Sequence, residues 1–113
     1  MVSRSRQRLV LPLDRVDVDE VISRVSSELD WTLEREGPDQ LTVSEDATKL
    51  HCHCAPLQAS VELSSTAPGE TEVRIEGRVA GWGPVSGQHV REQTELLARR
   101  IGLTAINERQ SGS

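Results

Sequence analysis

A chain of 113 residues with an apolar content of 35% is long enough for one domain with its own core. Since it contains two Trp but no Phe and no Tyr, Val, Leu and Ile must fill most of that core. The net charge of −5 argues against a general nucleic-acid-binding surface, and no apolar run approaches the roughly 20 residues needed to cross a bilayer.

The ends of the chain differ in character from its middle. We expect residues 1–7 to be a flexible basic leader, 8–103 to form a single domain and 104–113 to be a flexible tail. An arm that touches phosphate or an acidic partner is the alternative interpretation of the leader. Two cysteines make no disulfide framework, and the short apolar stretch after the leader is no export signal, so we expect a cytoplasmic protein.

The first elements are a strand and a helix. Arg8–Leu13 alternates apolar and other residues and predicts a strand, at a sheet edge because Pro12 cannot donate to a ladder. Asp17 and Glu20 fit a capping box that opens a helix. The apolar stripe of this helix comprises Val18, Val21, Ile22, Val25 and Leu29.

Alternating runs separated by turn residues then predict further strands. They cover Trp31–Glu36, Gln40–Ser44, Lys49–Cys54, Ala59–Ser64 and Thr71–Ala80. Gly77 lies on the apolar face of the last run and leaves a gap that a helix or a bulge can use. Ser86 is expected to cap a final helix, which Gly102 ends in the left-handed C′ position.

This order predicts an α+β fold, a two-layer sandwich with an open antiparallel sheet of five or six strands and two helices on one face. The polar faces of the strands would form the other surface. Its expected members are Thr32, Glu34, Glu36, Thr42, Ser44, His51, His53, Glu62, Glu72, Arg74, Glu76 and Arg78.

From Arg8 to Ile101 the order resembles the helix-grip domains of the START and polyketide-cyclase-like families, as does the glycine-broken loop Gly81-Trp82-Gly83-Pro84 before the last helix. The chain has one helix after its first strand where those families usually have two. The resemblance implies a curved sheet around the C-terminal helix, with an apolar ligand held between them.

The run His51-Cys52-His53-Cys54 concentrates the reactive side chains. On a strand both cysteines face the apolar side and both histidines face the solvent. We expect the cysteines to be small buried hydrophobic residues. His51 and His53 have a spacing that can hold one zinc ion if a neighbouring strand adds a ligand; two solvated histidines are the simpler interpretation.

Trp82 lies between Gly81 and Gly83, at the predicted mouth between the sheet and the final helix. It can cover a pocket or anchor a partner, or it can fold back and close the end of the core. With His89 of the final helix, these residues are our candidate binding site for a small apolar ligand or a protein partner.

Two further functions remain open beside this non-catalytic binding module. The sign alternation along Glu72, Arg74, Glu76 and Arg78 suits a solvated surface or a homodimer face. A metal-binding protein centred on His51 and His53 is the other alternative. No catalytic triad, phosphate-binding loop or pair of carboxylates on an apolar background supports an enzyme.

Overall fold

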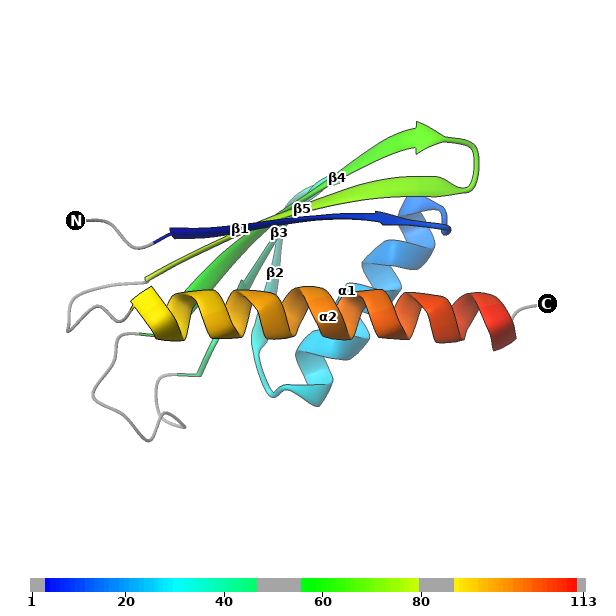
Figure 1. The fold of residues 1–113 in the computed structure, drawn as a ribbon. Helices are drawn as coiled ribbons and strands as arrows, with labels where there is room; N and C mark the ends of the chain where they lie inside the picture. The colour runs from blue at the N-terminus through cyan, green and yellow to red at the C-terminus, as the bar shows by residue number, and fades with distance from the viewer. Residues whose placement is uncertain (1–3, 47–55, 80–86, 112–113) are drawn as a thin grey trace.

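The structure, a computed structural model, describes residues 4–46, 56–79 and 87–111. It contains two helices and a five-stranded sheet (Figure 1). The elements are β1 (Arg4–Leu11), α1 (Arg15–Glu28), β2 (Thr32–Gly37), β3 (Gln40–Ser44), β4 (Leu57–Ala67), β5 (Glu70–Val79) and α2 (Gly87–Ser111). The strand order is β1-β5-β4-β3-β2, and every neighbouring pair is antiparallel.

This arrangement confirms the α+β fold class. The strand expected at Lys49–Cys54 falls entirely within residues 47–55, which lie outside the described ranges. None of the described helices is both long enough and apolar enough to cross a membrane.

Both helices cover the same face of the sheet, and α2 runs along it with α1 alongside (Figure 1). A single core joins the apolar stripe of α1, the inward residues of the strands and the stripe of α2. Val, Leu and Ile dominate this core, as the composition requires, and Trp31 and Leu33 pack at its margin. The alternation of apolar and polar residues therefore predicts correctly which side chains of the described strands face the helices.

The first two elements begin earlier than expected. β1 starts at Arg4, so residues 4–7 belong to the sheet and not to a flexible leader. α1 starts at Arg15 after the N-cap Asp14, whose side chain makes no capping hydrogen bond. The capping box at Asp17 and Glu20 is therefore wrong; Asp17 lies in the first helical turn, where its charge suits the helix dipole.

The last helix is longer than the sequence indicated. Gly102 lies inside α2, which continues to Ser111, so the expected helix end at Gly102 and the flexible tail from residue 104 are wrong. Ala105 is fully buried in the core, and Glu108 pairs with Arg24 of α1. Tertiary packing thus carries the helix past a residue that by itself favours termination.

Gly77 marks the point at which α2 crosses β5. A Cβ atom on Gly77 would lie 2.0 Å from Oγ1 of Thr94 and 3.1 Å from Cδ1 of Leu57. The sequence predicts that a helix or a bulge uses the gap at Gly77. In the structure it is the helix α2 that occupies it.

Candidate functional site

Most of the predicted site residues fall on segments that the structure does not describe. Gly81, Trp82, Gly83, His51 and His53 lie outside the described ranges. The binding site and the zinc site therefore stay predictions at these positions.

His89, in the first turns of α2, is the member of the predicted site that the structure does describe. Its Nε2 atom lies 2.8 Å from Oε1 of Glu45, just beyond the end of β3. Both side chains are well covered, with exposures of 17% for His89 and 7% for Glu45. The pair therefore links the start of α2 to the sheet.

Glu45 also holds the start of β4. The backbone N–H of Leu57 donates to Oε1 of Glu45 at 2.8 Å, and the backbone N–H of Glu45 donates to the carbonyl oxygen of Leu57 at 3.0 Å. Leu57 in turn faces Val79, the last residue of β5, in the ladder. The Glu45 carboxylate, at the end of β3, thus contacts both β4 and α2. We call the pair of Glu45 and His89 the hub.

Two chain connections start and finish at this hub. Residues 45–56 join β3 to β4, and residues 80–86 join β5 to α2. The first carries the His51–Cys54 run, and the second carries Trp82. All the reactive or aromatic residues singled out in the sequence, apart from Trp31, therefore belong to this end of the sheet or to the connections anchored there.

Beyond the hub, side chains fill the space between the sheet and α2. Leu57, Val61, Ile75, Leu97 and Ile101 have exposures of 1% or less. An apolar ligand cannot enter between these residues without displacing them. The described part of the predicted crevice is therefore a closed core, with the polar pair of Glu45 and His89 at one end.

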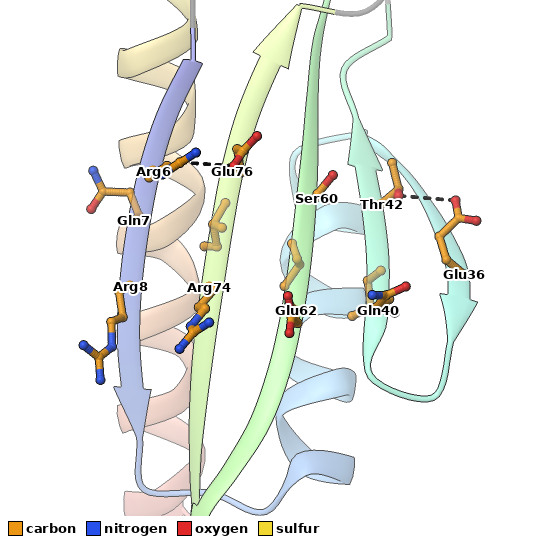
Figure 2. A pocket seen from close by; sticks show the side chains of 13 residues that line it. Arg6, Gln7, Arg8, Glu36, Gln40, Thr42, Ser60, Glu62, Arg74 and Glu76 are labelled. Atoms are coloured by element: carbon orange, nitrogen blue, oxygen red, sulfur yellow. Dashed lines mark hydrogen bonds and ion pairs between the residues drawn. The ribbon is translucent and has the colours of Figure 1, made fainter.

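A hollow of about 600 Å³ lies on the opposite, helix-free face of the sheet (Figure 2). Arg6, Arg8 and Arg74 line it on the side of β1 and β5. Across β4 and β3 it is lined by Ser60, Glu62, Gln40 and Thr42, and Glu36 of β2 accepts a hydrogen bond from Thr42 at 3.3 Å.

Glu72 is the residue of this face whose solvent exposure differs most from the expectation. We expected an exposed side chain, but Glu72 is buried beneath two arginines, with a residue exposure of 5%. Its Oε1 lies 2.9 Å from Nε of Arg8 and 2.8 Å from Nε of Arg74. The hydrogen bond from Arg74 and the charges of both guanidinium groups hold the pKa of the Glu72 carboxyl below its ordinary value, although burial opposes them.

Glu76 forms a second carboxylate link between the same strands. It lies 3.2 Å from Nε of Arg6 and 3.6 Å from Nη1 of Arg4. Both of these glutamates are thus paired with arginines across β1 and β5, in agreement with the solvated interpretation of this surface.

Sequence reasoning missed the hollow, although the alternation had assigned Glu36, Glu62, Arg74 and Glu76 to this face. The contribution of β1 was the missing part, because Arg6 and Gln7 fall in the segment expected to be a flexible leader. Within the described ranges, no group of three or more His, Cys, Asp or Glu residues is arranged to hold a metal ion.

Solved structures share this fold at low sequence identity. An HSP90 activator from Plasmodium falciparum matches with a TM-score of 0.60 and 13% identity, covering 97% of this chain and 96% of that one. Ara h 8.0201 matches with a TM-score of 0.56 and 8% identity, covering 95% of this chain and 99% of the other. A protein from Thermobifida fusca gives a TM-score of 0.53 at 14% identity, covering 95% and 92% of the two chains.

These likenesses establish the fold, and they confirm the resemblance to helix-grip domains at that level. No protein-family model matches the chain, and no curated protein matches its sequence.

Proposed function

We propose that this chain is a non-catalytic binding module whose site lies at the hub formed by Glu45 and His89. Gly81, Trp82 and Gly83 would complete the site from the connection between β5 and α2. The occupant would be a small apolar molecule or a segment of a protein partner. The observation that carries the proposal is the buried contact between His89 and Glu45, which joins the mouth of the fold to its sheet.

The anchoring of the connections supports a role for Trp82. Residues 80–86 leave β5 after Val79, which faces Leu57, and enter α2 two residues before His89. Because Trp82 follows Val79 by three residues and precedes Gly87 by five, we infer that it lies within reach of the hub. A large aromatic side chain there would serve as an anchor for a partner.

The closed core favours a bound group at the mouth over one that is engulfed. Because the side chains of Leu57, Leu97 and Ile101 are fully buried, a large cavity among the described residues between the sheet and α2 would require the core to open. The fold of an HSP90 activator, a protein that acts on another protein, is compatible with a protein segment as the occupant.

The proposal is tested by native mass spectrometry of untagged protein purified gently from cells. An adduct or a co-purifying protein should appear with the wild type and be lost with Trp82→Ala and with His89→Ala. The matched control is Gln88→Ala, at an exposed position beside His89, and it should keep the adduct. Retention of the adduct by both site variants would disprove the proposed location.

The same spectra address the alternatives. Self-association through the polar sheet face would double the mass, and charge reversal at Arg74 and Arg78 would abolish the doubling. We favour this alternative less because Glu72 and Glu76 already pair with arginines of their own chain. Bound zinc that is lost when His51 and His53 are both replaced by Ala would instead support the metal-binding alternative.

A further inference from the structure

The outer face of β1 and β5 concentrates positive charge in an otherwise acidic protein. Within the ladder that joins the two strands, this face carries five arginines and two glutamates, and Arg8 lies opposite Arg74 and Arg4 opposite Arg78. Like charges directly opposite each other destabilise a sheet unless a counter-charge compensates them. The buried Glu72 provides such a counter-charge for the pair of Arg8 and Arg74.

Glu72 orients the arginine pair and leaves part of each guanidinium group free. Arg8 uses Nε and Nη2 on Glu72, and Arg74 uses Nε. A guanidinium has five N–H donors, so each arginine retains donors that Glu72 does not use. The side chains of Arg8 and Arg74 are 69% and 63% exposed, and both line the hollow (Figure 2). Two pre-oriented guanidinium groups beside one hollow suit a carboxylate or phosphate group.

The rest of the hollow has a different chemistry. Glu62 lies next to Arg74 in the ladder on one side and next to Gln40 on the other, while Ser60 lies next to Thr42. A carboxylate, an amide and two hydroxyl groups accept and donate hydrogen bonds as sugar or polyol hydroxyl groups require. Since Glu62 would repel a second anionic group, the part of the ligand over β4 and β3 should be hydroxylated and uncharged.

We propose that this hollow binds a small anionic polyol. Its carboxylate or phosphate group lies against Arg8 and Arg74, and its hydroxyl groups reach Glu62, Ser60 and Thr42. The volume of about 600 Å³ is suited to a ligand of this kind. This site is separate from the hub at Glu45 and His89, which lies at the end of the sheet, and it does not depend on the proposed function.

A second copy of this chain is a poorer occupant. Glu72 and Glu76, which would have to meet arginines of the other copy, are already paired within the chain. Two identical hollows placed face to face would also enclose a large space that no side chain fills.

Four probes at constant ionic strength separate the features of the ligand. Sorbitol provides only hydroxyl groups and inorganic phosphate only the anion, whereas gluconate and sorbitol 6-phosphate combine hydroxyl groups with the two kinds of oxyanion. We expect saturable changes in the backbone amide NMR signals of Thr42, Ser60 and Arg74 with at least one of the combined probes. That probe should bind at least about tenfold more tightly than sorbitol or phosphate alone, the size expected from one additional charge-assisted hydrogen bond.

Matched variants test the role of the arginines. Arg74→Gln should weaken binding of the best probe by about tenfold or more, whereas Arg78→Gln, on the same strand and face but outside the hollow, should not. Glu62→Gln keeps the test valid if Arg74→Gln weakens the fold. Glu62 interacts with Arg74 through its charge, and its replacement should weaken binding of the hydroxyl groups of the probe.

Three results would overturn the proposal. They are the absence of saturation with all four probes, equal binding of phosphate and the combined probes, and equal losses for Arg74→Gln and Arg78→Gln. The last two would indicate an unspecific attraction of anions to the basic strands.

Discussion

The backbone of Gly77 in β5 lies so close to Thr94 of α2 that no other residue fits there without movement. The added Cβ atom would come within 2.0 Å of the Thr94 hydroxyl oxygen, which itself donates to the carbonyl oxygen of Val90 at 2.6 Å. This contact sets the depth at which α2 sits on the sheet.

Gly77→Ala should therefore destabilise the protein by about 1–3 kcal/mol, as overpacking of a closed interior usually does. Urea denaturation measures the loss. Replacing Thr94 by Ala removes the clashing oxygen, so the double variant should lose less stability than the sum of the two single variants. Strict additivity would contradict the close approach of the two residues.

Gly102 lies inside α2 with no atom within 4 Å of the position that a Cβ would occupy. Gly102→Ala should stabilise the protein by about 1 kcal/mol, because alanine has the higher helix propensity. Gly69 is the matched control: its φ of +72° disfavours any side chain, so Gly69→Ala should destabilise by about 1–2 kcal/mol. Thermal or urea unfolding should give changes of opposite sign.

Glu72 should make stability depend on pH. Since its pKa is depressed in the folded protein, its contribution is present above the pKa of the unfolded chain and is lost as the pH falls through the folded pKa. The difference in stability between the wild type and Glu72→Gln should therefore be largest near neutral pH and shrink on acidification. Urea titrations at a series of pH values provide the measurement.

The C-terminal part of α2 offers two adjacent positions with opposite environments. Ala105 is fully buried, and Ile106 is 49% exposed. Ala105→Gln should cost about 2 kcal/mol or more, because it adds volume and an amide to a closed core, whereas Ile106→Gln should cost less than about 1 kcal/mol. Similar losses at both positions in urea denaturation would mean that this part of the chain does not pack as described.

The sequence predicts the sheet faces well because the alternation is local. Residues such as Leu41, Val43, Val61 and Ile75 face inward wherever a strand forms, whatever its neighbours are. The stripe of α1 follows from helical spacing in the same way. These elements can therefore be predicted without knowledge of the tertiary structure.

The predictions that were wrong concern positions whose structure depends on a segment far away in the sequence. Glu72 is buried because β1, some sixty residues earlier, brings Arg8 beside it, as the separation of 64 residues in their hydrogen bond shows. Gly102 does not end α2 because Ala105 and Glu108 find partners in the core and on α1. The hollow combines both effects, since it needs the pairing of β1 with β5 and the inclusion of Arg6 in the sheet.

The pairing of β1 with β5 also has a consequence for synthesis on the ribosome. β1 is made first, but it cannot enter the sheet until β5 has emerged, and α2, which packs against it, follows later still. During this interval β1 remains an unpaired strand, a state in which many sequences aggregate. Its three arginines keep the unpaired strand charged, so Arg6 and Arg8, which line the hollow in the folded protein, would also protect the nascent chain from aggregation.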